Sequence, residues 1–177
     1  LEPIVDIYQG DTLLHRLVKV TETDALGIVQ AVRKNDFSKL EAMFISDEDA
    51  RFLKKQKRVA LRHCGVVNPT SIDDYINNQG YQALDKALRM EPEAVIEEIK
   101  VSGLAGRGGA GFPTWFKWDA ARKAEVEHKH LICNADEGDP GAFMDRAVIE
   151  SDPHTLIEGM LIGAYAIGAS DMYVYIR

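Results

Sequence analysis

The alternation of hydrophobic and polar residues at the start of the chain predicts a β-hairpin. The runs 4–8 and 13–20 are rich in Ile, Leu and Val, and they flank turn-forming residues at 9–12. The run Thr21-Glu22-Thr23-Asp24 resembles a capping box, which predicts a helix toward Lys34. The chain is therefore expected to begin with a hairpin and a helix.

Helix signals follow through the middle of the chain. Ser46 and the acidic residues after it form a cap signal for a helix over 50–57. Three more short helices are separated by turn and cap residues, namely Ser71, Gly80, Pro92 and Gly103. Val95, Ile96 and Ile99 fall at helical spacing in the last of them, which predicts one buried face. We expect residues 41–90 to form a helical linker region.

The last stretch has the pattern of a βαβ unit. The apolar run 130–134 predicts a strand, a short helix is expected around 145–150, and the run 172–176 predicts a second strand. Asp152 is a cap residue and Gly168 a helix terminator, so a longer helix is expected between them. The two strands should pair in parallel with a right-handed crossover. Because the chain stops at the second strand, we expect an α/β flavin-type domain truncated at its C-terminal side.

A glycine-rich loop lies between the helical region and the first strand of that unit. Residues 103–111 contain five glycines, which leave backbone N–H groups accessible to an anion. Arg107 and Lys117 add positive charge, and aromatic residues stand between them. The loop also matches G-x-G-x-x-G, but a Rossmann site needs a strand before the loop and a helix opening within it. Here the preceding segment is predicted to be helical, and Pro113 falls inside the helix that a Rossmann site would require. The loop therefore predicts a phosphate-bearing aromatic ligand but not a Rossmann site.

A second polar cluster follows the strand predicted at 130–134. Asp136, Glu137 and Asp139 occupy three of four consecutive positions among turn-forming residues. Ligands of open α/β sheets bind at the carboxyl ends of strands, and this is such an end. Taken alone, the cluster is as consistent with a solvated acidic turn as with a site that binds sugar hydroxyls. Next to the glycine loop, a site is the favoured interpretation.

The two motifs together resemble a known family. The runs that carry the resemblance are GRGGAGFPTWFKW at 106–118 and CNADEGDPGAFMDR at 133–146. They are similar to the FMN- and NADH-binding subunit of respiratory complex I and to the diaphorase subunits of NAD(P)-linked iron hydrogenases and NAD-dependent formate dehydrogenases. The second run is closest to the hydrogenase-type members, because complex I subunits usually carry Glu where this chain has Asp139. The resemblance covers about residues 58–177.

The resemblance implies a role for ten residues. FMN would be contacted by Gly106, Arg107, Gly108, Gly109, Lys117, Asn134, Asp136 and Glu137. Phe112 would stack on the bound dinucleotide, and Asp139 would contact its nicotinamide end. Arg107 would meet the FMN phosphate, and Lys117 would balance the negative charge of the reduced flavin. No residue of this chain is expected to act as a catalytic group or a metal ligand.

The implied protein is an electron-input subunit that oxidises NAD(P)H, or reduces NAD(P)⁺, through FMN. It would pass electrons to iron–sulfur clusters, as in NADH dehydrogenase or a NAD(P)-linked or bifurcating hydrogenase. Its partners would be the dinucleotide and other iron–sulfur subunits of a multi-subunit oxidoreductase. Residues 91–177 would be the N-terminal part of the FMN/NAD(H)-binding domain, and residues 1–40 the C-terminal part of a thioredoxin-like ferredoxin domain. The fragment alone is expected to be inactive.

Two other functions remain open at this point. The electron-input subunit of sodium-pumping ferredoxin–NAD oxidoreductases shares part of the glycine loop, although Arg107 and Asp136 count against it. A non-catalytic assembly fragment belongs to a different class, and bound yellow flavin would separate catalyst from scaffold. The basic run 51–62 is either a solvated face or a docking patch for an acidic partner.

Composition and cysteine content limit the function further. A net charge of −7 argues against nucleic acid as a partner, and no apolar run is long enough for direct membrane insertion. The start of the chain has no signal-peptide pattern, so a cytoplasmic location is expected. Cys64 and Cys133 are the only cysteines, whereas a 4Fe–4S cluster needs four thiolates. The cluster ligands of the full-length protein are therefore expected outside this chain.

Overall fold

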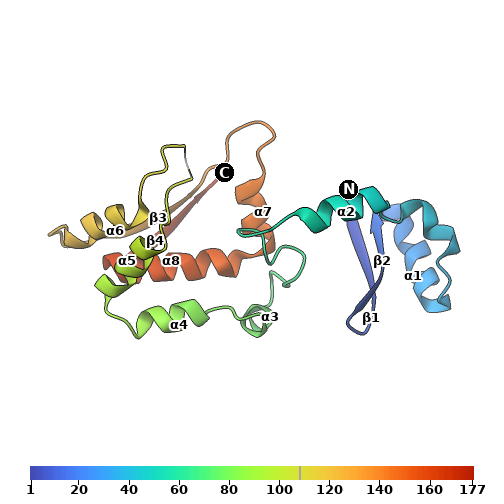
Figure 1. Ribbon diagram of the computed structural model, residues 1–177, viewed down its shortest axis with the longest axis horizontal. Helices are drawn as coiled ribbons and strands as arrows, with labels where there is room; N and C mark the ends of the chain where they lie inside the picture. Colours follow the sequence, from blue (N-terminus) through green and yellow to red (C-terminus); the bar gives the residue numbers. More distant parts are fainter. Residues whose placement is uncertain (108) are drawn as a thin grey trace. The chain divides into compact units, whose positions relative to one another are not determined.

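The computed structural model describes residues 1–107 and 109–177 and divides the chain into two compact units (Figure 1). Unit 1 is Leu1–Lys57 and unit 2 is Arg58–Arg177. The division falls inside the stretch that the sequence predicts to be a helical linker.

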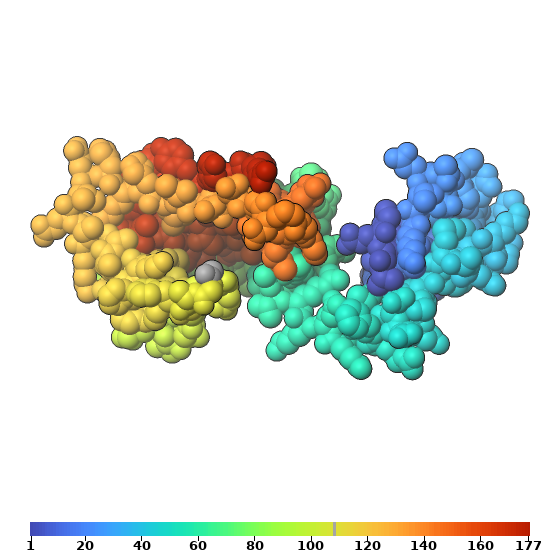
Figure 2. Space-filling view, turned by 90° about the horizontal axis from the view of Figure 1, so that it is seen from above, coloured from blue at the N-terminus to red at the C-terminus, as the bar shows by residue number. Residues whose placement is uncertain are grey.

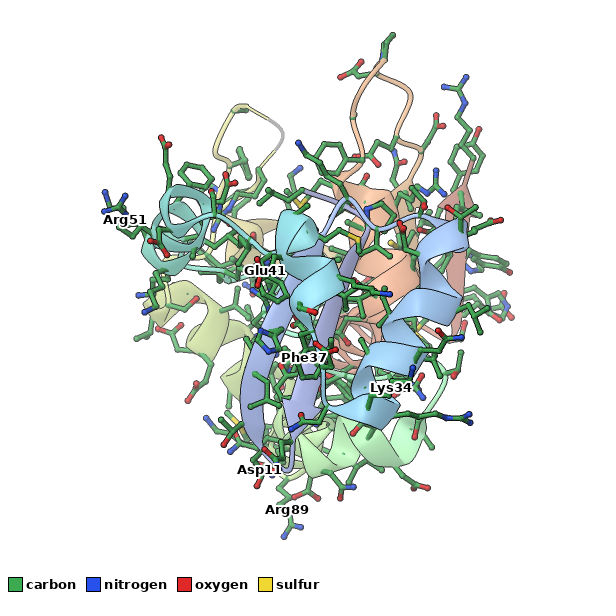
Figure 3. All side chains as sticks on the ribbon, turned by 90° about the vertical axis from the view of Figure 1, so that its right-hand side faces the viewer. Asp11, Lys34, Phe37, Glu41, Arg51 and Arg89 are labelled. Carbon is green, nitrogen blue, oxygen red and sulfur yellow. The ribbon has the colours of Figure 1, made fainter. Side chains whose placement is uncertain are left out.

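Unit 1 is a β-hairpin with helices packed against it. Its elements are β1 (Ile4–Gln9), β2 (Thr12–Val18), the 3₁₀ turn η1 (Glu22–Asp24), α1 (Ala25–Lys34), the 3₁₀ turn η2 (Ser38–Met43) and α2 (Asp47–Lys55). The predicted hairpin is present: β1 and β2 pair antiparallel, with Asp11 at the tip of the turn (Figure 3). Asp24 accepts hydrogen bonds from the backbone N–H and the hydroxyl of Thr21, so the predicted N-terminal signal begins a 3₁₀ turn that continues into α1.

The core of unit 1 lies between the hairpin and α1. It is formed by buried residues of the two strands, of the segment that follows β2, of α1 and of η2, namely Ile7, Leu17, Val20, Ile28, Ala31 and Leu40. His15 stacks on Phe44 with ring centroids 4.6 Å apart, and Asp6 accepts two hydrogen bonds from the guanidinium of Arg16. The stack of His15 on Phe44 holds the hairpin against the segment that leads to α2, and the bonds between Asp6 and Arg16 join the two strands.

Unit 2 is a helical layer on a two-stranded parallel sheet. Its elements are α3 (Ile72–Asn77), α4 (Gln82–Leu88), α5 (Pro92–Val101), α6 (Thr114–Lys123), β3 (His130–Ala135), α7 (Met144–Ser151), α8 (Pro153–Ile167) and β4 (Asp171–Ile176). The strands β3 and β4 pair in parallel from His130 opposite Asp171 to Ala135 opposite Ile176. Both α7 and α8 lie between them in the sequence.

The helix α8 is the centre of unit 2. Asp152 caps it by accepting the N–H of Thr155 at 3.1 Å, Pro153 is its first residue, and Gly168 ends it with φ = 75°. A Cβ at Gly163 would lie 2.9 Å from Leu131 and 3.3 Å from Trp118, so glycine allows α8 to approach β3 and α6 closely. Ala87, Val95, Ile96 and Ala166 form the buried core between α8 and the helices α4 and α5.

Candidate functional site

The glycine loop is tied together at its base. It follows α5 rather than a strand, as predicted, and the N–H of Gly106 donates to the carbonyl of Phe112 at 2.8 Å. The N–H of Thr114 donates to the carbonyl of Leu104 at 3.0 Å, one step further out. The loop is thereby held in place by the ends of two helices.

The interior of the loop needs glycine for its backbone conformation. Gly109 has φ = 94° and Gly111 has φ = 60°, a region that residues with a side chain rarely adopt. A Cβ at either position would meet no atom within 4 Å. Glycine is therefore required at these positions because of the backbone conformation and not because neighbouring atoms leave no room for a side chain. Among the described residues, the space beside the loop is open. The predicted contact at Gly108 lies outside those residues.

Two cations and an exposed aromatic pair lie at this loop. The side chain of Arg107 is exposed and donates to the carbonyl of Ala105 at 2.6 Å. The ammonium group of Lys117 lies 5.4 Å from the ring centre of Phe112, which packs edge-on against Phe116. Phe112 is 44% exposed and Phe116 is 52% exposed, so their rings are available for stacking on a planar ligand.

The N-terminus of α6 opens beside the loop. Pro113 precedes the helix, no side chain caps it among the described residues, and its first turn carries no acidic residue. A helix N-terminus attracts an anion through its N–H groups and its dipole. The nearby Lys117 adds a full positive charge. These features suit a phosphate group.

The two tryptophans belong to the core of unit 2. Trp115 and Trp118 are half-buried and pack against the core of unit 2 on the inner side of α6. Lys100 lies over the ring of Trp115, with its ammonium group 5.3 Å from the ring centre. These contacts anchor α6 and hold the opposite side of the helix, with Lys117, toward solvent.

The acidic turn lies at the carboxyl end of β3, where the strand pattern predicts it. The side-chain oxygen of Asn134 accepts the N–H of Asp136 at 3.0 Å, which starts the turn. The side chains of Asp136 and Asp139 are exposed. Glu137 differs from both, because its two oxygens accept N–H groups of Asp145 and Arg146 at 3.1 and 3.2 Å.

These hydrogen bonds favour the ionised form of the Glu137 side chain. Desolvation alone would raise the pKa of the carboxyl group, but the backbone N–H groups at the start of α7 outweigh it and lower the pKa below its usual range. The carboxylate is therefore ionised at neutral pH.

A hollow of about 420 Å³ lies at the carboxyl ends of β3 and β4. Its lining includes the charged side chains of Glu137, Arg146, Glu150 and Arg177. Arg177 also donates to the carbonyl of Gly138 at 3.3 Å, which ties the end of β4 to the acidic turn. The sequence-based site does not include Arg146 or Arg177, although Arg146 ends the second motif run and Arg177 directly follows the second predicted strand.

The glycine loop and the acidic turn project from the same side of unit 2 (Figures 1 and 3). Seen from that side, the surface is recessed between them (Figure 2). No hydrogen bond joins the two segments among the described residues. The structure thus brings the two predicted groups of ligand-binding residues to one face and leaves space between them.

Sequence reasoning missed a buried polar cluster beneath α8. Glu158 is 7% exposed and accepts the hydroxyl of Tyr75 at 2.5 Å and the N–H groups of Tyr81 and Leu84 at 3.0 Å each. At the start of α8, His63 pairs with Asp152 at 2.8 Å. A single carboxylate inside the most apolar helix of the chain is the signal that could have revealed the cluster.

Neither a membrane-spanning helix nor a metal-binding cluster is observed in the described part of the chain. Among residues 1–107 and 109–177, no helix combines the length and apolar character needed to cross a bilayer. The same residues contain no group of three or more His, Cys, Asp or Glu side chains placed to hold a metal ion.

The glycine loop and the acidic turn both fall within a segment that matches a known domain family. Residues 99–177 match the family model of the Nuo51 FMN-binding domain. This match covers every residue that the resemblance assigned to a site, and it confirms the resemblance.

Individual relatives agree with the family model. The chain is 57% identical over 124 residues to the NADP-reducing hydrogenase subunit HndC of Solidesulfovibrio fructosivorans, covering 70% of this chain and 25% of the relative. It is 56% identical over 107 residues to a subunit of the NADH-quinone oxidoreductase of Aquifex aeolicus, covering 60% of this chain and 25% of the relative. The chain thus spans about a quarter of the length of these relatives.

A solved structure extends the similarity to both units. A chain of NAD⁺-reducing [NiFe]-hydrogenase in the air-oxidized state matches with a TM-score of 0.52 and 25% sequence identity. The match covers 92% of this chain and 26% of that chain. The mixed helix and strand fold of this chain is therefore similar to that of part of this hydrogenase chain.

Proposed function

We propose that this chain is part of an electron-input subunit that exchanges hydride with NAD(P)(H) through FMN and delivers electrons to iron–sulfur clusters. The observation that carries the proposal is the glycine loop. It offers a glycine backbone, two cations and, among the described residues, a helix N-terminus without a side-chain cap, all within the segment that matches an FMN-binding domain. Because the chain spans a quarter of its relatives' length, it would work within a longer polypeptide.

The residues of the glycine loop fit the phosphate end of FMN. Arg107 offers a guanidinium fork suited to phosphate, and the backbone of Gly106, Gly108 and Gly109 would approach the ligand closely. Lys117 would lie toward the flavin ring and favour its reduced, anionic form. Bound flavin supplies the chemistry that couples two-electron and one-electron transfer, while the protein orients it and sets the local charge.

The residues of the acidic turn fit the ribityl hydroxyls of FMN and the nicotinamide end of the dinucleotide. Asn134 and Asp136 would face the flavin and its ribityl hydroxyls. The resemblance also assigns Glu137 to the flavin, but its carboxylate is bonded to the N–H groups of Asp145 and Arg146. Asp139 would contact the nicotinamide end of the dinucleotide, and the exposed ring of Phe112 would stack on the dinucleotide. The dinucleotide and iron–sulfur subunits of a larger oxidoreductase are the proposed partners.

The fold assignments complete the proposal. Residues 91–177 would be the N-terminal part of a βαβ flavin-binding domain, residues 41–90 its helical linker, and residues 1–40 the end of a thioredoxin-like ferredoxin domain. The hairpin followed by α1 supports the last assignment. The 4Fe–4S ligands would lie elsewhere in the longer polypeptide.

The test compares lysine and arginine variants of the longer polypeptide. Arg107→Ala and Lys117→Ala should each lower FMN content or NAD(P)H oxidation with an artificial acceptor, because each removes a cation that faces the ligand. A hydrogen bond to a charged group contributes about 1.5–3 kcal/mol, or roughly ten- to a hundredfold in affinity. Lys123→Ala is the matched control, since Lys123 lies on the same helix and pairs with Asp119 at 2.7 Å.

The outcome is read from bound flavin and turnover together. Full flavin content and unchanged turnover in both variants would show that the assigned roles are wrong. The 177-residue chain by itself should bind FMN only weakly, because a partial pocket loses preorganised contacts. Stoichiometric flavin on this chain would contradict that expectation.

A further inference from the structure

Glu137 is placed as a helix cap although it belongs to the acidic turn. Its two oxygens accept the N–H groups of Asp145 and Arg146, the second and third residues of α7. These N–H groups have no partner within the helix, and the preceding residue, Phe143, supplies no side-chain bond. A carboxylate at this position is stabilised both by hydrogen bonding and by the helix dipole. Glu137 therefore does for α7 what Asp152 does for α8.

The cap closes the segment between β3 and α7 into a fixed loop. Within it, the N–H of Ala142 donates to the carbonyl of Asp139 at 3.0 Å, and Gly141 has φ = 83°. Arg177 ties the carbonyl of Gly138 to the end of β4. Asp139 therefore lies at the tip of a loop that is secured on both sides, while its own side chain is exposed.

We propose that Glu137 is a positioning residue, which sets the place of Asp139 by capping α7 instead of contacting the flavin. This proposal rests on the proposed function for the identity of the ligand, a nicotinamide dinucleotide. It assigns the three acidic residues of the turn to different tasks. Asp136 and Asp139 present exposed carboxylates to ligands, and the carboxylate of Glu137 is occupied by the backbone of α7.

The first experiment tests the cap without any ligand. Hydrogen exchange at the amides of Asp145 and Arg146 is measured in the 177-residue chain. In Glu137→Ala both amides lose their acceptor and should exchange about ten- to a hundredfold faster, as expected for a lost hydrogen bond to a charged group. Glu137→Gln keeps one acceptor oxygen, so only one of the two amides should exchange faster. Asp136→Ala is the matched control, because Asp136 is the neighbouring acidic residue of the turn and its side chain is exposed.

Amides in the middle of α8 report whether the variants fold, and their exchange should be unchanged. Equal exchange at Asp145 and Arg146 in the wild type and both Glu137 variants would overturn the cap. This result would leave the proposed function untouched, because no cofactor is involved.

The second experiment tests the route through Asp139 in the longer polypeptide. Glu137→Gln, Asp139→Asn and the double variant form a cycle in which dinucleotide affinity and FMN content are measured. Glu137→Gln should weaken dinucleotide binding several-fold with full FMN content. The double variant should be no weaker than Asp139→Asn alone, because a residue that acts through Asp139 has nothing left to position.

Each alternative has its own signature in the cycle. Loss of FMN in Glu137→Gln would make Glu137 a flavin contact, and additive losses would make it independent of Asp139; either result overturns the proposal. If Asp139→Asn leaves dinucleotide affinity unchanged, the placement of Asp139 in the proposed function fails, and the positioning role fails with it even where the exchange data support the cap.

Discussion

Replacing Glu158 should strongly destabilise unit 2. The carboxylate is buried on α8 and accepts hydrogen bonds from Tyr75, Tyr81 and Leu84. Glu158→Ala leaves the two N–H groups at the start of α4 without an acceptor, whereas the Tyr75 hydroxyl keeps a contact with Thr155 at 3.1 Å. Each buried N–H group left without an acceptor costs about 1–3 kcal/mol, so the two together cost about 2–6 kcal/mol. This is a large share of a typical stability of about 5–15 kcal/mol.

A conservative substitution separates the charge from the hydrogen bonds. Glu158→Gln keeps the size of the side chain and one acceptor oxygen. If that oxygen faces Tyr75 and Tyr81, the amide group faces the N–H of Leu84, and a single bond is lost. The expected cost is about 1–3 kcal/mol. Glu98→Ala is the control, because Glu98 is exposed and its pair with Lys86 should contribute less than about 1 kcal/mol.

Urea unfolding followed by tryptophan fluorescence measures these differences. Both tryptophans lie on α6, so the signal reports on unit 2 alone. The free energy of unfolding is obtained by linear extrapolation to zero urea. A Glu158→Ala protein within about 0.5 kcal/mol of the wild type, the range of an ordinary surface substitution, would refute the assigned role of the buried cluster.

Three further predictions concern single residues. In the longer polypeptide, Asp139→Asn should weaken NAD⁺ more than NADH at constant flavin content, because only the oxidised ring is positively charged; equal weakening of both would return Asp139 to a structural role. Burial and the bond to Glu158 raise the pKa of Tyr75 from 10.0 to about 12. Since an unfolded tyrosine titrates near pH 10, the contribution of the protonated phenol is complete below pH 10 and lost as the pH rises toward 12. Urea midpoints should therefore fall over that range more steeply in the wild type than in Tyr75→Phe, and parallel curves would contradict this. Gly80→Ala should cost about 1–3 kcal/mol of unfolding free energy, because its Cβ would overlap the buried ring of Tyr75. Gly159→Ala is its control, since a Cβ there meets no atom within 4 Å and should stabilise α8 by about 0.5–1 kcal/mol.

Much of this fold can be predicted from the sequence, because helix caps and turns depend only on residues that are close together in the chain. Asp152 and Gly168 begin and end α8 as their residue types indicate, and the hairpin turn at 9–12 falls between β1 and β2. The partners of Glu158 could not be predicted in this way. Its three donors precede it by 74–83 residues, and no local pattern specifies that distance.

The candidate site likewise has a part that the sequence predicts and a part that it does not. The loop conformation follows from glycines at positions that need positive φ, and the acidic turn follows from its place after a strand. The direction of each carboxylate was not predictable. Asp136 and Glu137 are adjacent acidic residues, yet only Glu137 reaches N–H groups eight and nine residues further along the chain. The flavin contact of Asp136 stays a prediction, whereas Glu137 is proposed to position Asp139.

The long separation between Glu158 and its donors has a consequence for biosynthesis. Tyr81 leaves the ribosome 77 residues before Glu158. At a synthesis rate of about 5–20 residues per second, this interval lasts about 4–15 s. Throughout that time the N–H groups at the start of α4 have no buried acceptor, so the nascent segment stays open to chaperones and proteases. Translation of α8 is the event that ends this exposure.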